Sequence, residues 1–152
     1  MNIVLNNEPV TILLVEDNPG DVRLTMEALK DSKLLVNVSV AGDGVEALAM
    51  LRQQGPHVRA PRPDLILLDL NLPNKDGREV LDEIKQDPLL KAIPVVILTT
   101  SDAERDILQC YEQHASCFVT KPIDLEQFFR VVKSIEGFWF TIVKLPPPAG
   151  VR

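Results

Sequence analysis

The spacing of apolar residues alternates between two patterns along this chain. Short apolar runs rich in β-branched residues predict five strands, at residues 11–15, 36–41, 64–70, 93–100 and 116–121. Between these runs, apolar residues recur at intervals of three and four, which is the period of a helix with one buried face. Strands that alternate with helices predict an α/β fold, in which right-handed crossovers build an open parallel sheet with helices on both faces.

Each predicted helix has an apolar face that we expect to lie against the sheet. In chain order, the residues of these faces are Val22, Met26 and Leu29; Val45, Leu48 and Ala49; Val80, Leu81 and Ile84 of helix 77–86; Ala103, Ile107 and Tyr111; and Leu125, Phe128, Phe129, Val132 and Ile135. Arg52 marks the exposed end of the second helix. Ser101 and Glu104 form a capping box that begins the fourth. The proline-bearing segment 53–63 predicts a loop.

Composition is typical of a single globular domain. The 152 residues are 45% hydrophobic and 25% charged, which is enough apolar material for one core. A net charge of −6 and the lack of a basic stripe in the sequence disfavour direct binding of nucleic acid. No apolar run is long enough to span a membrane, and residues 1–10 do not resemble a signal peptide, so we expect a soluble cytoplasmic protein with no membrane partner. Cys110 and Cys117 do not form a metal-binding pattern and are expected to be buried thiols.

Polar residues lie at or just after the carboxyl ends of four of the predicted strands. In chain order they are Glu16 and Asp17, Asp69, Thr99 and Thr100, and Lys121. Because parallel strands end at the same edge of a sheet, and ligands of such sheets bind there, we expect these side chains to share one site. Three carboxylates gathered at one edge repel each other unless a cation binds between them. The sequence therefore predicts a site for Mg²⁺, which typically takes one or two carboxylates and keeps several waters.

A carboxylate beside a metal ion can act as a nucleophile toward a phosphoryl group. Asp69 is the best placed candidate, because it ends an otherwise unbroken apolar strand. Lys121 would supply a fixed positive charge. The acidic loop after the first strand lacks the Gly-rich pattern that cradles phosphate directly. Taken alone, Glu16 and Asp17 also fit simple loop and helix-cap roles, and only the joint placement of all these residues favours a site.

Four segments together resemble the receiver domain of two-component response regulators: VEDN at 15–18, LLDLNLPNKDG at 67–77, VVILTTS at 95–101 and FVTKP at 118–122. The resemblance implies a flavodoxin-like (βα)5 fold, with a doubly wound five-stranded sheet in the order 2-1-3-4-5. It also implies that the protein is not an enzyme but a phosphoacceptor signalling domain, with Mg²⁺-dependent autophosphorylation and autodephosphorylation.

The resemblance assigns a role to each acid of the site. Asp69 would accept a phosphoryl group from a phosphohistidine of a sensor histidine kinase. Mg²⁺ would be held by Asp17, Asp69 and the main-chain carbonyl of Asn71, and Glu16 would contribute through a water molecule.

Four more residues would form the switch that reads the phosphoryl group. Thr99 would move to bond the acyl phosphate, Lys121 would pair with it, and Phe118 would rotate inward after Thr99. The fourth helix, fifth strand and fifth helix would then present a changed surface. Phe118 equally fits a simple core role, since an aromatic ring packs well at a strand position whether or not it moves. Thr100 is bulkier than the Ala or Gly that many receivers carry there, and so could hinder the water that hydrolyses the phosphate.

Aromatic residues gather in the C-terminal part of the chain, and all seven lie at or after Tyr111. We divide the chain into an N-terminal extension at 1–9, a receiver domain at 10–136, and an aromatic extension with a proline-rich tail at 137–152. The exposed apolar area of the extension favours a contact between copies, while a tail packed on its own domain is the alternative. The expected surface for a homodimer or partner consists of Tyr111, Phe128, Phe138, Trp139 and Phe140.

The segment IEGFWFTIVKLPPP and the loop at 53–63 also resemble the small response regulators that serve cyanobacterial phytochromes. This narrower resemblance implies a stand-alone regulator whose phosphodonor is a light-regulated histidine kinase. Two other functions stay open at this point. One is a Mg²⁺-dependent phosphatase of the haloacid dehalogenase type, which needs a second acid where this chain has Asn71. The other is an interaction module that keeps the fold and the dimer but does not depend on phosphorylation.

Overall fold

The structure is a computed structural model, and it describes residues 9–30, 36–99, 117–120 and 126. Its helices and strands are β1 (Val10–Val15), α1 (Pro19–Lys30), β2 (Val36–Ala41), α2 (Gly44–Leu51), the 3-10 turn η2 (Gly55–His57), β3 (Leu65–Asp69), α3 (Gly77–Gln86), β4 (Val95–Thr99) and β5 (Cys117–Thr120). All five strands agree with the predicted runs to within two residues at each end. The helix expected after Ser101 lies outside the described residues, and of the helix expected after Asp124 only Glu126 is described, in a helical conformation.

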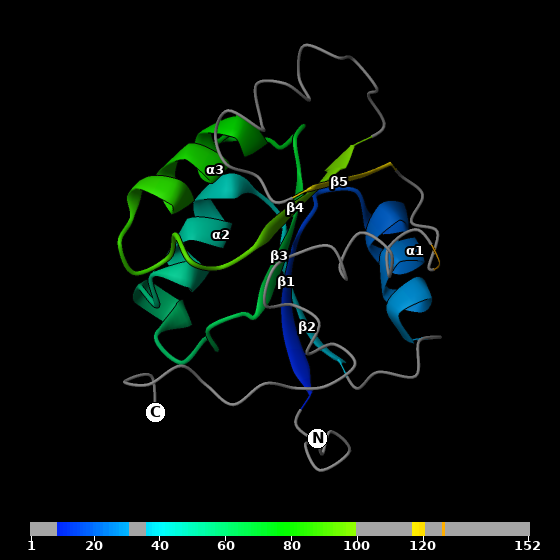
Figure 1. The fold of residues 1–152 in the computed structure, drawn as a ribbon, viewed down its shortest axis with the longest axis horizontal. Coiled ribbons are helices and arrows are strands. Elements are labelled where there is room, and N and C mark those ends of the chain that lie inside the picture. The colour runs from blue at the N-terminus through cyan, green and yellow to red at the C-terminus, as the bar shows by residue number, and fades with distance from the viewer. Residues whose placement is uncertain (1–8, 31–35, 100–116, 121–125, 127–152) are drawn as a thin grey trace.

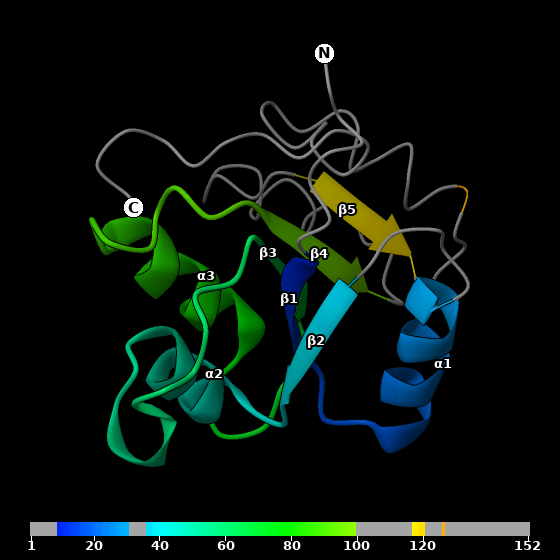
Figure 2. The same ribbon diagram turned by 90° about the horizontal axis from the view of Figure 1, so that it is seen from below.

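The five strands form one parallel sheet in the order β2-β1-β3-β4-β5 (Figure 1), which confirms the predicted order. Figure 2 shows α1 on one face of this sheet and α2 and α3 on the other, so the doubly wound α/β fold is also confirmed. The chain runs outward from β1 to β2 and then returns to β3 on the other side of β1. The direction of the connections therefore reverses between β1 and β3, which is where sheets of this kind bind their ligands.

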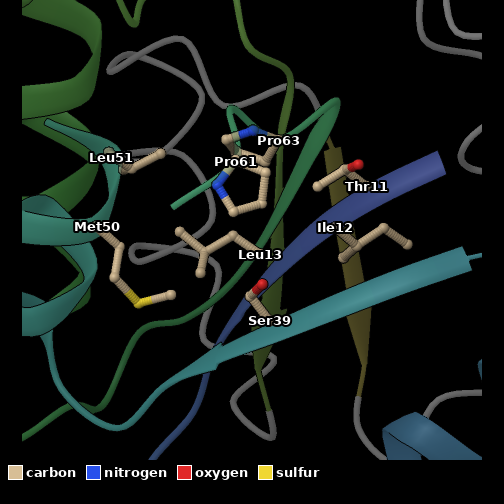
Figure 3. Close-up of a pocket in the computed structure, with 8 residues that line it drawn as sticks. All are labelled: Thr11, Ile12, Leu13, Ser39, Met50, Leu51, Pro61 and Pro63. Carbon is tan, nitrogen blue, oxygen red and sulfur yellow. The ribbon is translucent and has the colours of Figure 1, made fainter. Parts of the chain in front are cut away.

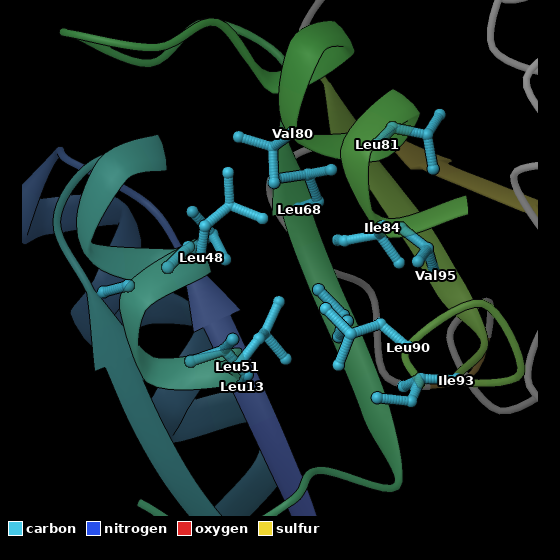
Figure 4. Close-up of a cluster of buried hydrophobic side chains, with 14 of the residues drawn as sticks. Leu13, Leu48, Leu51, Leu68, Val80, Leu81, Ile84, Leu90, Ile93 and Val95 are labelled. Atoms are coloured by element: carbon cyan, nitrogen blue, oxygen red, sulfur yellow. The ribbon is translucent and has the colours of Figure 1, made fainter. Parts of the chain in front are cut away.

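Among the described residues the core consists of two clusters, one on each face of the sheet, and β3 contributes to both. Ile66 and Leu68 belong to the cluster beneath α2 and α3 (Figure 4), whereas Leu65 and Leu67 belong to the cluster that includes Leu29 of α1. All five residues of β3 are buried. Since alternate side chains of a strand point to opposite faces, a strand covered on both sides must be apolar at every position. This explains the unbroken run that precedes Asp69.

The inner face of α1 differs from the prediction. Leu29 is buried and Val22 is partly buried, as expected, but Met26 is 38% exposed and Thr25 is only 3% exposed. The helix is rotated so that its buried stripe includes Thr25 and excludes Met26. Hydrophobicity alone predicts that Met26 is buried, but the rotation of the helix about its axis decides which residues contact the sheet.

The buried face of α2 is shifted by one residue from the predicted face. Val45 is 54% exposed and Ala49 is only half-buried, while the buried residues are Gly44, Ala47, Leu48 and Leu51. Gly44 lies where no larger residue fits, because a Cβ atom there would be 2.4 Å from the carbonyl oxygen of Lys75. This close approach sets the rotation of the helix and leaves Val45 exposed. The prediction for α3 is confirmed in full, because Val80, Leu81 and Ile84 are all buried.

The predicted loop at 53–63 contains the η2 turn and folds over the end of α2. Within it, the Gln53 side chain donates a hydrogen bond of 2.7 Å to the carbonyl oxygen of Ala60. The loop is tied to the segment after α3 by a hydrogen bond from the Arg62 guanidinium to the carbonyl oxygen of Leu89. Among the residues that the structure describes, none belongs to a helix that is both long and apolar enough to cross a membrane.

Candidate functional site

Three acids meet at the carboxyl edge of the sheet, at the point where the connections reverse. In the parallel pairing of β1 with β3, Val15 lies beside Leu68, so the residues that follow them, Glu16 and Asp69, are brought together. Asp17 comes next in the chain. Carboxylate oxygens of Glu16, Asp17 and Asp69 all lie within 4.8 Å of one another, and this confirms the predicted gathering of acids.

The three acids differ in their exposure to water. Glu16 is 1% exposed and Asp69 is 3% exposed, whereas Asp17 lies at the surface. The backbone N–H of Asn18 donates a hydrogen bond of 3.2 Å to Glu16, and the N–H of Asn71 donates one of 3.3 Å to Asp69. Both buried carboxylates are thus oriented by the loop that follows their own strand.

This donor set suits a hard divalent cation. Ions such as Mg²⁺ and Ca²⁺ are bound by carboxylate and carbonyl oxygens, and a bound cation offsets the repulsion between the neighbouring carboxylates. The two buried acids, Glu16 and Asp69, are held by hydrogen-bonded backbone, while Asp17 faces the solvent from which an ion and its waters would come. Among the described residues, these three acids are the one group with the spacing of a metal site.

The loop from β3 to α3 is shaped by Asn74 in its middle and by Gly77, the first residue of α3. Asn74 has a φ of +66°, a left-handed conformation that asparagine adopts more readily than most residues. The N–H of Gly77 donates a hydrogen bond of 2.9 Å to the carbonyl oxygen of Leu70 and so closes the loop on itself. A side chain on Gly77 would have no room, because a Cβ atom there would lie 2.3 Å from the carbonyl oxygen of Asp69.

The other predicted residues of the site are described in part. Thr99 ends β4 one position beyond Leu98, which pairs with Asp69, so the backbone of Thr99 lies at the same edge as the acids. Phe118 lies in β5, paired with Ile97. The remaining predicted residues lie outside the described part of the chain: Thr100, Lys121, Tyr111, Phe128, Phe138, Trp139 and Phe140.

One polar contact beside the site was not anticipated from the sequence. The side chain of Asp43, just before α2, accepts hydrogen bonds from the backbone N–H of Glu46 at 2.7 Å and from the side chain of Asn74 at 2.8 Å. These contacts hold the pKa of the Asp43 carboxyl below its usual value of 3.8, and the backbone N–H of Glu46 is the largest cause. In the sequence, the Asp-Gly pair at 43–44 before an apolar segment is typical of a helix N-cap. Nothing in the sequence indicates the contact with Asn74.

A small pocket lies beside the amino half of β1 (Figure 3). It is lined by Thr11, Ile12, Leu13, Ser39, Met50, Leu51, Pro61 and Pro63. Thr11 is near the beginning of β1, while Glu16 follows its end, so the pocket belongs to the amino half of the sheet and the acids belong to the opposite edge. Its lining is mostly apolar and contains no charged side chain, which gives it nothing to contribute to phosphoryl chemistry.

A family model for the response regulator receiver domain matches residues 12–133, well over half of the chain. The chain belongs to the response regulator receiver family. This membership confirms the resemblance found in the four sequence segments. It also favours a two-component signalling domain over the haloacid dehalogenase type of phosphatase, in agreement with an amide, Asn71, where that class needs a second acid.

Known receivers resemble this chain over nearly all of its length. Response regulator Rcp1 of Synechocystis sp. is 53% identical over 141 residues, which cover 93% of this chain and 96% of Rcp1. The crystal structure of the Mn²⁺-bound form of Rcp1 matches with a TM-score of 0.76, at 53% identity, over 91% of this chain and 100% of that one. The phosphorylated cyanobacterial phytochrome response regulator RcpA matches with a TM-score of 0.77, at 54% identity, over 92% of this chain and 100% of RcpA. This receiver is therefore related to phytochrome response regulators of cyanobacteria.

Proposed function

We propose that this receiver accepts a phosphoryl group on Asp69 from a phosphohistidine of a sensor histidine kinase. The observation that carries the proposal is the position of Asp69, a carboxylate only 3% exposed, at the end of β3 within 4.8 Å of two further acids. In the transfer, a carboxylate oxygen of Asp69 attacks phosphorus, a P–O bond forms, and the P–N bond breaks. The imidazole nitrogen leaves and takes up a proton.

The acids and the neighbouring loop would hold a divalent cation, which we take to be Mg²⁺. Asp17, Asp69 and the main-chain carbonyl of Asn71 would bind it directly, and Glu16 would bind through a water molecule. When bound, the ion neutralises negative charge on the carboxylate and on the phosphoryl oxygens. The chain's own part is to orient Asp69, and the N–H of Asn71 does so from 3.3 Å.

The phosphoryl group would be read by residues on the neighbouring strands. Thr99 ends β4 beside the site and would donate its hydroxyl to the acyl phosphate, while Lys121 would pair with the added charge. Phe118 on β5 would then rotate inward, and Thr100 would affect how fast water removes the phosphate. The surface that changes would be the helix expected after Ser101, β5 and the helix expected after Asp124.

The partner proposed for this chain is a phytochrome histidine kinase, because its relatives include a cyanobacterial phytochrome response regulator. Such an exchange would occur in the cytoplasm, where ATP is available to the kinase. We also propose a homodimer that uses the aromatic surface defined above, Tyr111, Phe128, Phe138, Trp139 and Phe140, without nucleic acid or membrane. Monomeric sedimentation at micromolar concentration, with and without phosphorylation, would count against the dimer.

Intact mass after incubation with phosphoramidate and Mg²⁺ tests the phosphoacceptor. We expect one phosphoryl adduct in the wild type, and its loss in Asp69→Asn or when EDTA is present. Asp82→Asn is the matched control, since Asp82 is an exposed acid of α3 outside the site and should still give the adduct. If the wild type gives no adduct and also fails to bind beryllofluoride, the chain is instead an interaction module that does not depend on phosphorylation.

A further inference from the structure

The loop between β3 and α3 carries Asn71 and is therefore part of the proposed cation site. Its two ends are fixed from within, by the hydrogen bond from Asn71 N–H to Asp69 and by the bond from Gly77 N–H to the carbonyl oxygen of Leu70. The middle of the loop needs a different support, because Asn74 there is exposed and has a left-handed backbone.

That support comes from the segment before α2, far away in the sequence. The Asn74 side-chain amide donates a hydrogen bond of 2.8 Å to one carboxylate oxygen of Asp43. The other oxygen of the same carboxylate accepts the N–H of Glu46 at 2.7 Å and caps α2. A hydrogen bond to an ionised acceptor is stronger than one between neutral groups. One carboxylate thus fixes the beginning of α2 and the middle of the loop relative to each other.

A second contact holds the same two segments together. A Cβ atom on Gly44 would lie 2.4 Å from the carbonyl oxygen of Lys75 and 2.7 Å from Cγ2 of Val80. The first turn of α2 therefore lies directly against the loop, with no side chain between them. On the other side, the Lys75 ammonium donates to the carboxylate of Glu83 on α3. The loop is held between α2 and α3, and Asp43 provides its polar contact on the α2 side.

We infer that Asp43 and Asn74 are positioning residues for the cation site: their hydrogen bond holds the β3–α3 loop in the conformation that keeps Asn71 beside Asp69. The inference rests on the proposed function, since it takes the Asn71 carbonyl to be a ligand of the cation. Neither residue touches the cation. Their loss should weaken binding of the ion by letting the loop relax, roughly tenfold, the smaller end of the effect seen when groups that orient metal ligands are removed.

Asn74→Gly is the informative variant. Glycine accepts the left-handed backbone without strain, so this change removes the hydrogen bond and leaves the preferred φ available. Calorimetric titration with Mn²⁺ gives the dissociation constant directly, and we expect it to rise about tenfold. The Mg²⁺ concentration for half-maximal adduct formation with phosphoramidate should rise by the same factor, and excess Mg²⁺ should restore the adduct.

Gln53→Gly is the matched control. Gln53 is also exposed, has a φ of +53°, and donates a side-chain hydrogen bond within its own loop, but it lies after α2 and away from the acids. Its replacement should leave the Mn²⁺ dissociation constant unchanged. A fall in affinity as large as that of Asn74→Gly would show that any loosened loop has this effect, and would overturn the inference.

A double-mutant cycle separates the hydrogen bond from the charge of Asp43. Asp43→Ser keeps a good helix cap but is too short to reach Asn74, and it also removes a negative charge. If the hydrogen bond acts as inferred, Asn74→Gly should weaken Mn²⁺ binding in the wild type and have little further effect in Asp43→Ser. Additive effects would overturn it. A wild type that binds no Mn²⁺ and forms no adduct would overturn the proposed function itself, whereas normal binding by Asn74→Gly would overturn only this inference.

Discussion

Replacement of Gly77 by alanine tests how tightly the end of β3 is packed against α3. A Cβ atom at this position would lie 2.3 Å from the carbonyl oxygen of Asp69 and 2.7 Å from Cα of Leu70, whereas real Cβ contacts shorter than 3.0 Å essentially do not occur. The helix and the strand must therefore separate by about 0.7 Å, the difference between 3.0 and 2.3 Å. Both close contacts are to backbone, so no side chain can rotate away to make room.

The strand cannot supply this movement. β3 is paired with β1 on one side and with β4 on the other, and all of its residues are buried. The helix must move instead, which pulls Val80 and Leu81 out of their packing. Overpacking of this kind costs about 1–3 kcal/mol. Gly77 is the first residue of α3, so the gain that alanine brings in the middle of a helix does not apply. We expect a loss of about 1–3 kcal/mol, and a fall in Tm of about 2–12 °C for a chain of this size.

Urea denaturation followed by circular dichroism measures this loss, with Gly42→Ala as the control. A Cβ atom on Gly42 would meet only the Glu46 carboxylate, at the ordinary distance of 3.8 Å, and its φ is one that alanine adopts. The control should stay within about 0.5 kcal/mol of the wild type, as substitutions at open surface positions usually do. If Gly77→Ala proves as stable as this control, the strand and helix can separate freely and the reasoning above is wrong.

Three further outcomes are expected. Ile84→Ala empties a fully buried position beneath α3 and should cost about 2–5 kcal/mol in urea denaturation, and Ile84→Val about 0.5–1.5 kcal/mol. The hydrogen bond from the Lys75 ammonium holds the pKa of Glu83 below its usual value of 4.5. The stability that this pair contributes is therefore present at neutral pH and is lost as the pH falls below about 4.5. In Glu83→Gln the loss of stability on acidification should be smaller. Mg²⁺ at about ten times its Kd should raise the free energy of unfolding by about 1.4 kcal/mol, and EDTA or Asp69→Asn should abolish this rise in a thermal melt.

The sheet and the acidic edge could be predicted because each is encoded in a short stretch of sequence. A strand with both faces covered must be apolar throughout, and residues 65–68 satisfy this without exception. The end of such a strand is equally visible, so Asp69 could be assigned to the ligand-binding edge before its neighbours were known. The gathering of Glu16 and Asp17 with it follows from topology, since β1 and β3 are adjacent and parallel.

The inner faces of α1 and α2 could not be read from hydrophobicity in the same way. At Gly44 the helix approaches the backbone of the β3–α3 loop so closely that no side chain fits, and the apolar Val45 is left exposed as a result. The requirement for a small residue at position 44 comes from a segment about 30 residues away in the sequence. The local spacing of apolar residues therefore cannot reveal it. The hydrogen bond between Asp43 and Asn74 was missed for the same reason, because it joins two polar residues 31 positions apart.

The packing that holds the sheet also explains how two buried acids can be kept side by side. Repelling carboxylates would normally move apart, but Glu16 follows β1 and Asp69 ends β3, and these two strands are paired in register and packed on both faces. Neither strand can shift without breaking the ladder and opening a core cluster, so the two carboxylates stay close together in the folded protein. A cation that binds there gains from oxygens already in place and does not have to order them. The two apolar clusters therefore do more than stabilise the fold, since they keep the acids at the separation that the proposed cation site requires.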